Sequence, residues 1–188
     1  TEGSEIQQQW LISAGKANAG IQLLIIDEDG NSLKPGLAGE SVVKHEHIMQ
    51  GYWNDKKATA NTIRNGFLHM GDIGYLDEDG FLYIVDRKKD MFISGGENIY
   101  PAEIERVVAG HPDVALVAVG SIPDEDKGEL AKAYIVPKTG TDPDSDDIIR
   151  YCREHLAAYK VPRAVQFVDD LPKTSTGKVM RRELKTLD

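Results

Sequence analysis

The segment Pro172-Lys173-Thr174-Ser175-Thr176-Gly177-Lys178 places a lysine in a polar loop near the end of the chain. Threonine, serine and glycine favour an exposed loop, which can carry an ammonium group into a reaction site. A compact, strongly hydrated cation such as Lys178 suits a phosphate or a developing carboxyl oxygen. An ordinary solvated lysine is the alternative, and composition alone favours it. A phosphate-binding P-loop is excluded, because Pro172 occupies the required glycine position and Val179 replaces the hydroxyl residue that would hold Mg²⁺.

A second candidate is Asp72, which lies between two glycines in Gly71-Asp72-Ile73-Gly74. A carboxylate accepts two hydrogen bonds, which suits a vicinal diol, and the flanking glycines leave room for a sugar. A plain turn aspartate is the alternative for an isolated tetrapeptide. Further along, the charged stretch 86–90 comes shortly before Gly95-Gly96. Charge keeps a segment in water and glycine frees the backbone, so this combination is typical of a hinge.

Taken together, these motifs resemble the C-terminal third of an adenylate-forming acyl-CoA synthetase of the AMP-binding enzyme family, most closely a fatty-acid–CoA ligase. The resemblance covers essentially all 188 residues. In that family the final lysine of Pro-Lys-x-x-x-Gly-Lys bridges the substrate carboxylate and the α-phosphate of ATP, and this role falls on Lys178. The resemblance also implies that Asp72 accepts hydrogen bonds from the ribose hydroxyls. Arg87 would hold the nucleotide with its planar fork, although a surface ion pair with a neighbouring Asp is the alternative.

The resemblance assigns further roles around the charged stretch. Lys89 stands where the family has its hinge, about which the C-terminal domain rotates between an adenylating and a thioester-forming pose. Lys178 serves the first pose. The second is served by a coenzyme A-binding loop whose glycines let backbone lie against the pantetheine arm; its residues are Ser94, Gly95, Gly96 and Glu97. Glu2 would end a motif that approaches the nucleotide and Mg²⁺.

The implied whole enzyme is an acid–thiol ligase. A carboxylic acid and ATP give an acyl-adenylate and pyrophosphate, and the coenzyme A thiol then releases AMP. Fatty acids are the first expectation for the acid, and aromatic acids such as coumarate or benzoate are the alternative. A non-catalytic binding or regulatory module is a hypothesis of a different class. Because the acid pocket, the pyrophosphate loop and most of the Mg²⁺ site belong to the family's larger N-terminal part, we expect the chain alone to be inactive.

The overall charge narrows the range of partners. A net charge of −9 argues against nucleic acid or an anionic membrane. One cysteine and no long apolar run favour a cytoplasmic protein without a transmembrane segment. An apolar patch on residues 1–85 would favour self-association, including a homo-oligomer. A basic cluster near the C-terminus could steer ATP or coenzyme A phosphates, or simply suit the terminal helix; its members are Lys173, Lys178, Arg181, Arg182 and Lys185.

Hydrophobic patterning predicts an α+β fold with two differently organised parts. Residues 1–86 are expected to form an antiparallel β-rich subdomain, 87–90 a hinge, and 91–188 a small α+β C-terminal lid domain. In the first part we expect strands at 21–26, 40–44, 67–75 and 81–85 and a helix at 56–63. In the second we expect helices from 101 and 142 and at 180–187, a central strand at 114–119, its neighbour at 131–136 and a strand at 164–168.

Several reactive-looking side chains fit ordinary structural roles. Cys152 lies on the apolar stripe of a helix, which indicates a core residue and not a nucleophile. His45 and His47 alternate along an expected strand, which indicates an exposed strand face. Tyr52 and Trp53 are interpreted as packing residues, because buried aromatic side chains usually belong to a core.

Overall fold

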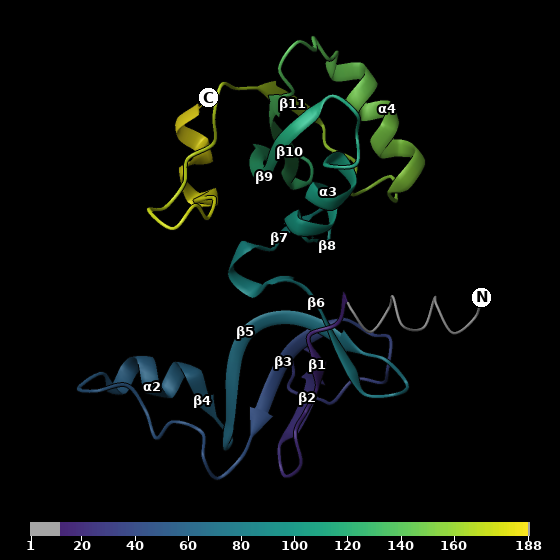
Figure 1. Cartoon of the computed structure of the whole chain (residues 1–188). Coiled ribbons are helices and arrows are strands. Elements are labelled where there is room, and N and C mark those ends of the chain that lie inside the picture. The colour runs from purple at the N-terminus through teal and green to yellow at the C-terminus, as the bar shows by residue number, and fades with distance from the viewer. Residues whose placement is uncertain (1–11, 188) are drawn as a thin grey trace. The chain divides into compact units, whose positions relative to one another are not determined.

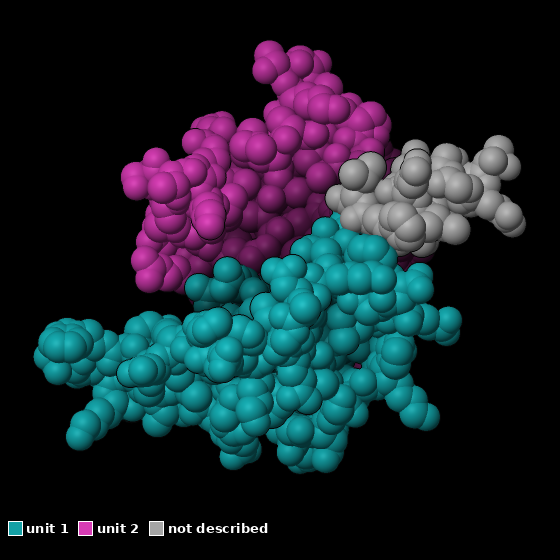
Figure 2. Space-filling view, turned by 60° about the horizontal axis from the view of Figure 1, so that its bottom comes forward, with its two compact units in different colours: residues 1–89 teal, residues 90–188 magenta. Residues whose placement is uncertain are grey.

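The computed structural model describes residues 12–187, which form two compact units that divide after Lys89 (Figure 2). Each unit has its own sheet (Figure 1). The expected α+β class is confirmed. No helix in the described part of the chain is long and apolar enough to cross a membrane.

Unit 1, which ends at Lys89, is built on an antiparallel sheet of six strands. The strand order is β1-β6-β5-β3-β2, and β4 pairs with β5 beside that path. The elements are β1 (Gly15–Lys16), β2 (Gln22–Ile26), β3 (Gly39–Lys44), α2 (Lys56–Thr62), β4 (Ile63–Arg64), β5 (Phe67–Leu76) and β6 (Phe81–Arg87).

Local chemistry explains the reversals of unit 1. In the acidic turn before β6, the Asp77 carboxylate accepts hydrogen bonds from the backbone N–H groups of Asp79 and Phe81, at 3.0 and 2.8 Å. Gly80 then takes a φ of 82°, a conformation that costs glycine little. Helix α2 begins where predicted, because the Asp55 carboxylate accepts from the Ala58 N–H at 2.8 Å and caps the helix.

The packing role predicted for Tyr52 and Trp53 is wrong for this unit. Their exposed fractions are 50% and 92%. The chain reverses sharply here, with an isolated bridge between Tyr52 and Asp55 and a positive φ of 54° at Asn54. This reversal ahead of α2 turns both aromatic side chains into solvent.

Unit 2, from Asp90 onward, packs two helices against a sheet of five strands. The strand order is β11-β10-β7-β8, with β9 also on β10, and only the β10–β11 pair is parallel. The elements are η1 (Lys88–Asp90), which spans the unit boundary, β7 (Phe92–Ser94), β8 (Glu97–Ile99), α3 (Pro101–Val108), β9 (Val114–Asp124), β10 (Gly128–Pro137), α4 (Ser145–His155), β11 (Ala164–Phe167) and η2 (Arg181–Leu187).

The core of unit 2 lies where the helices meet the sheet. Ile104 and Val108 of α3 and Ile148 of α4 are fully buried together with Val119 and Ile135 of the sheet. Burying apolar area of this kind stabilises a unit by roughly 25 cal/mol per Å². Proline at the first position of α3 helps to start that helix, as the sequence indicated.

Cys152 belongs to the same core, so its predicted structural role is confirmed. The thiol is fully buried on α4. Burial raises its pKa to about 11. A thiol of that kind holds very little nucleophilic thiolate.

Three expectations about strands and helices need correction, two in unit 2 and one in unit 1. β10, and not β9, is the central strand, because β9 and β11 both pair with residues 132–135 of β10 and must take opposite edges. Leu116 of β9 is accordingly 44% exposed despite its apolar neighbours. The expected terminal helix is the 3₁₀ segment η2, and β6 continues to Arg87, beyond its expected end.

Candidate functional site

Lys178 lies at the end of a small ordered loop of unit 2. An isolated bridge joins Lys173 and Val179, and the Thr174 N–H donates to the Lys178 carbonyl at 2.8 Å. Gly177 has a φ of 81° and donates its N–H to the Thr174 carbonyl at 2.9 Å, which closes the turn. The loop backbone is therefore fixed although it is exposed.

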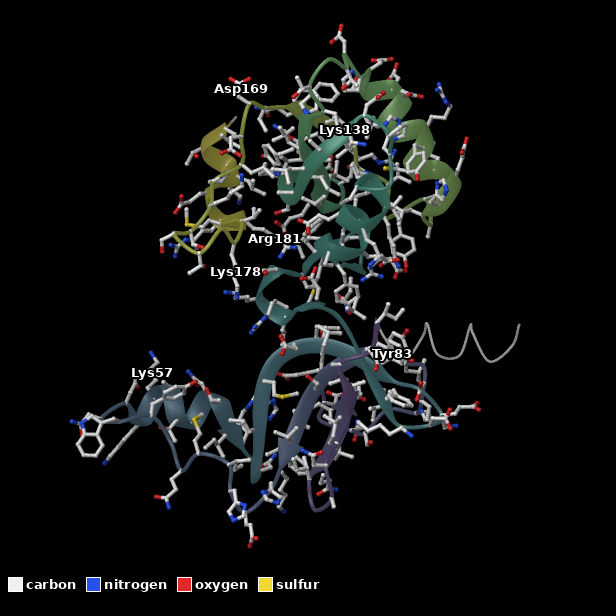
Figure 3. The ribbon with its side chains drawn as sticks, viewed as in Figure 1. Lys57, Tyr83, Lys138, Asp169, Lys178 and Arg181 are labelled. Carbon is white, nitrogen blue, oxygen red and sulfur yellow. The ribbon has the colours of Figure 1, made fainter. Side chains whose placement is uncertain are left out.

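The ammonium group of Lys178 is not fixed in the same way. Its side chain is exposed, and among residues 12–187 no hydrogen bond or ion pair holds its Nζ. Figure 3 shows the labelled side chain extending outward from the ribbon of its own unit. A fixed loop with a free cation can present charge to a ligand. The role of Lys178 in catalysis stays a prediction.

The basic side chains around Lys178 are engaged differently from one another. Arg181 spreads its guanidinium over two carboxylates, with Nη2 2.6 Å from Glu105 Oε2 and Nη1 2.9 Å from Asp90 Oδ2. Lys173 pairs with Asp170 at 2.5 Å. The basic cluster expected to steer phosphates is therefore not uniform. Arg181 and Lys173 are already paired with carboxylates of unit 2.

The expected coenzyme A-binding loop is the tight hairpin between β7 and β8. Ser94 pairs with Glu97, and the two glycines between them have φ values of 59° and 87°. Positive φ at both central positions is the geometry of a two-residue hairpin turn that glycine favours. The Gly95 N–H also donates to the Lys127 carbonyl at 3.0 Å, which ties the hairpin to the β9–β10 turn. Both glycines are exposed, so their backbone is accessible to a narrow ligand.

Asp72 and Arg87 are direct cross-strand partners on β5 and β6 of unit 1. The Arg87 Nε lies 2.9 Å from Asp72 Oδ1, with side-chain exposures of 58% and 23%. Gly71 precedes Asp72 with a φ of 72°, and the register shifts between Ile73 and Gly74. These irregularities locally interrupt the regular pairing of β5 with β6. One carboxylate and one guanidinium are thereby held together at the surface.

The sequence did not reveal a buried charge cluster around Glu40 of β3. The Glu40 Oε2 lies 2.9 Å from Lys88 Nζ, 3.1 Å from His69 Nδ1 and 3.5 Å from Arg64 Nη2. Its side chain is only 7% exposed. Burial raises the pKa of this carboxyl, but the Lys88 and His69 contacts outweigh burial and hold the pKa below its ordinary value.

A cavity of about 270 Å³ opens beside this cluster, lined by Glu40, Arg64 and Lys88 among others. The signal that could have found the cluster is the carboxylate itself, which stands near the start of a strand that carries two valines. A charge in such a position requires partners. Sequence alone does not name Lys88 as the partner.

Residues 87–90, the expected hinge, do not share one secondary structure. Arg87 belongs to β6, while Lys88–Asp90 form the 3₁₀ segment η1. Lys88 and Lys89 are exposed, whereas Asp86 before them is buried, with an exposed fraction of 6%. The strand therefore ends before Lys89. Rotation at Lys89 stays a prediction.

Two further expectations concern the strand face of His45 and His47 and the metal ligand Glu2. His45 and His47 follow the end of β3 at Lys44, so they are not on a strand face as expected. Their rings lie 4.9 Å apart, and with Glu46 they offer three donor atoms within 4.8 Å of one another. The two imidazole rings meet edge-on, at an interplanar angle of 62°, where the chain turns after β3. Glu2, the expected metal ligand, lies outside the described residues.

The structure brings together one predicted pair, Asp72 and Arg87, within unit 1. Lys178 and the glycine hairpin belong to unit 2. The predicted set is thus shared between the two compact units, with Lys89 at their boundary in the chain.

Comparison with known proteins identifies the family. Residues 103–178 match the model of the AMP-binding enzyme C-terminal domain. The chain is 49% identical over 175 residues to the 2-succinylbenzoate–CoA ligase of Geobacillus kaustophilus, covering 93% of this chain and 36% of the relative. It is 43% identical over 173 residues to a feruloyl-CoA synthase of an Amycolatopsis species, covering 92% of this chain and 35% of the relative.

Solved structures agree with these matches. The o-succinylbenzoate CoA synthetase of Bacillus subtilis, in complex with its acyl-adenylate intermediate, superposes with a TM-score of 0.87 at 40% identity. The match covers 96% of this chain and 37% of that one. The same synthetase is also known in complex with ATP and a magnesium ion. This chain spans about a third of the length of the relatives that it matches. Residues 103–178 therefore form an AMP-binding enzyme C-terminal domain, and the chain is similar to the corresponding part of adenylate-forming CoA ligases.

Proposed function

We propose that this chain is the C-terminal part of an aromatic-acid–CoA ligase, which activates its acid as an acyl-adenylate. The observation that carries the proposal is the 43–49% identity, over more than nine-tenths of the chain, to ligases named for 2-succinylbenzoate and ferulate. Both acids are aromatic. The fatty-acid expectation has no comparable support, and an aromatic acid, the alternative drawn from the sequence, is the better proposal.

In the first proposed step, a carboxylate oxygen of the acid attacks the α-phosphorus of ATP. The bond from that phosphorus to the bridging oxygen of pyrophosphate breaks, which gives acyl-adenylate and pyrophosphate. Negative charge gathers on the oxygens around phosphorus as this happens, and the ammonium of Lys178 neutralises it. The free Nζ on an ordered loop supports this role, because no internal ion pair among the described residues must first be broken.

Asp72 and Arg87 serve the nucleotide in this proposal. The Asp72 carboxylate accepts hydrogen bonds from the two ribose hydroxyls, while Arg87 donates to ribose or phosphate oxygens. Their 2.9 Å contact supports the assignment, since it fixes the acceptor and donor next to each other before ligand arrives. Mg²⁺ is expected to assist the triphosphate in the parent enzyme. We assign it no ligand among the described residues.

In the second proposed step, the coenzyme A thiol loses its proton to solvent water and its sulfur attacks the acyl carbonyl. The bond to AMP breaks, which releases the thioester and AMP. The hairpin of Ser94, Gly95, Gly96 and Glu97 presents bare backbone to the pantetheine arm. The exposed glycines support this role, because a side chain at either position would stand in the path of the arm.

The test is pyrophosphate release by the enzyme that contains this chain, with 2-succinylbenzoate, ferulate, benzoate and a long-chain fatty acid as substrates. We expect kcat/KM to be highest for an aromatic acid. Mass spectrometry of the product should then find the matching acyl-CoA. Preference for the fatty acid would overturn the substrate class, and release with no acid would overturn the ligase assignment.

A further inference from the structure

The two residues beside Lys89 in the chain are each held by an ion pair in their own unit. Lys88 is bound by Glu40 of unit 1, and Asp90 is bound by Arg181 of unit 2. Lys89 itself is exposed, and among residues 12–187 no ion pair or hydrogen bond of its side chain is found. Lys89, the expected pivot, therefore lies between two residues whose side chains are held by ion pairs.

The first anchor is strong because its acceptor is buried. Glu40 is 6% exposed and stands in β3, the strand next to β5 in the sheet of unit 1. Its Oε2 lies 2.9 Å from the Lys88 ammonium, and the lowered pKa keeps the carboxyl charged. A buried carboxylate that loses its cation is costly, so the end of β6 is held to β3.

The second anchor reaches from the pivot to the loop of Lys178. Arg181 donates a hydrogen bond to Asp90 at 2.9 Å. Its Nε and Nη2 donate to the Glu105 carboxylate of α3, at 3.1 and 2.6 Å. Glu105 in turn accepts the Val119 N–H of β9 at 2.8 Å. Figure 3 shows the labelled Arg181 close to Lys178 on the same segment of unit 2. The Met180 N–H, next to Arg181, donates to the Pro172 carbonyl at 2.8 Å and closes the Lys178 loop.

We propose that these two anchors confine rotation to Lys89 and that Arg181 couples this pivot to the position of Lys178. Charge-assisted hydrogen bonds join Asp90 to Arg181, and Arg181 directly follows Met180, whose backbone N–H closes the Lys178 loop. Asp90, Arg181 and the loop therefore turn as one body when the backbone of Lys89 rotates. Arg181 is thus a positioning residue that acts through Lys178. The inference deepens the proposed function and rests on it for the role of Lys178.

Arginine is the residue suited to this coupling. Its planar fork spans the carboxylates of Glu105 and Asp90 at once, whereas a lysine ammonium is a single point charge. Arg181→Lys should therefore keep the charge but release one partner. Arg181→Gln should release both partners.

The first experiment is hydrogen–deuterium exchange on the 188-residue chain. The backbone N–H groups of Thr174, Gly177 and Met180 donate to backbone carbonyls of the loop. Arg181→Gln should speed exchange at these amides by about tenfold, the effect of losing a hydrogen bond to a charged group. Arg153→Gln, on the exposed side of α4, is the matched control and should leave their exchange unchanged.

The second experiment measures both half-reactions in the enzyme that contains this chain. Asp90→Asn removes the charge that strengthens the link to the pivot but leaves the Glu105 contact of Arg181 in place. We expect adenylation to fall by about 10-fold to 100-fold, as for a misplaced catalytic group, while thioester formation from supplied adenylate stays within about twofold. A merely destabilised domain would slow both half-reactions together.

The outcomes separate this inference from the proposed function. Unchanged loop exchange in Arg181→Gln would overturn the anchor, whatever the activity. An equal fall of both half-reactions in Asp90→Asn would overturn the coupling. If no acid supports pyrophosphate release in the unaltered enzyme, the proposed function fails, and faster exchange in Arg181→Gln would still establish the anchor.

Discussion

Arg87 and Asp72 face each other across β6 and β5, with the guanidinium Nε 2.9 Å from a carboxylate oxygen. Each was expected to serve the nucleotide, and each had an ordinary structural alternative. The structure shows the ion pair, and the nucleotide role stays a prediction. An exposed ion pair contributes little stability, typically below about 1 kcal/mol. Arg87 is 58% exposed, so ligand binding is a stronger reason for this pair than fold stability.

Asp72→Ala should therefore weaken nucleotide binding more than folding. In the enzyme that contains this chain, we expect the KM for ATP to rise by about tenfold or more, because hydrogen bonds to a charged acceptor contribute about 1.5–3 kcal/mol each. Steady-state kinetics with varied ATP measures the change. Asp79→Ala, in the exposed turn before β6, is the control. An unaltered KM for ATP in Asp72→Ala would remove the aspartate from the nucleotide site.

Lys178→Ala should abolish most adenylation and spare thioester formation. Loss of one positioned donor to a developing oxyanion typically lowers the rate by about 10²–10³-fold. Pyrophosphate release measures the first half-reaction, and thioester formation from supplied acyl-adenylate measures the second. Lys57→Ala on α2, an exposed lysine labelled in Figure 3, is the matched control. Equal losses in the two half-reactions would count against the assignment.

Lys89→Pro tests the pivot. Proline fixes its own φ and restricts the residue before it, so rotation at this position should be blocked. We expect one half-reaction to survive and the other to fall, according to the pose that the proline favours. Lys89→Ala keeps the backbone free and is the control. If both half-reactions continue unchanged in Lys89→Pro, the hinge lies elsewhere.

Features that depend on neighbours in the chain were predicted well. The helix expected at 56–63 is started by its Asp55 cap, and the helix expected from 101 by its proline, so each start depends on residues within one turn of backbone. The hairpin at Gly95 and Gly96 also has a local origin, although it was not predicted. Hydrophobic runs also located most strands, although they could not show that β10 and not β9 is central.

Features that join distant parts of the chain were missed. Glu40 and Lys88 are 48 residues apart, and Arg181 and Asp90 are 91 apart. Each of these charges has many possible partners in the sequence, and only the folded sheet selects one. The apparent basic cluster at the C-terminus illustrates this, since Arg181 faces inward to carboxylates while Lys178 faces solvent.

Cys152 should resist a thiol reagent until the chain unfolds. The side chain is fully buried, and burial raises its pKa to about 11, so the reactive thiolate is scarce at neutral pH. It is the single cysteine of the chain, which makes the readout unambiguous. Labelling followed against urea concentration should coincide with loss of circular dichroism. Rapid labelling in the absence of urea would contradict the burial.

Glu40→Gln should destabilise the chain at neutral pH. The substitution keeps the shape of the side chain but removes the charge that holds Lys88 and His69. We expect the free energy of unfolding to fall by about 1–3 kcal/mol, the cost of losing a charged hydrogen-bonding group in a buried site. Urea denaturation measures the difference. Glu78→Gln, in an exposed turn of unit 1, is the control and should change stability little.

The stability difference between the wild type and Glu40→Gln should also depend on pH. Because the pKa of Glu40 is lower when folded than its ordinary value of 4.5, the folded state binds this proton less readily than the unfolded state. The stabilisation is therefore fully present above pH 4.5 and disappears as the pH falls through the lowered folded pKa. The stability gap between the wild type and Glu40→Gln should narrow below pH 4.5. A gap that stays constant or widens on acidification would show that the charge of Glu40 is not what stabilises unit 1.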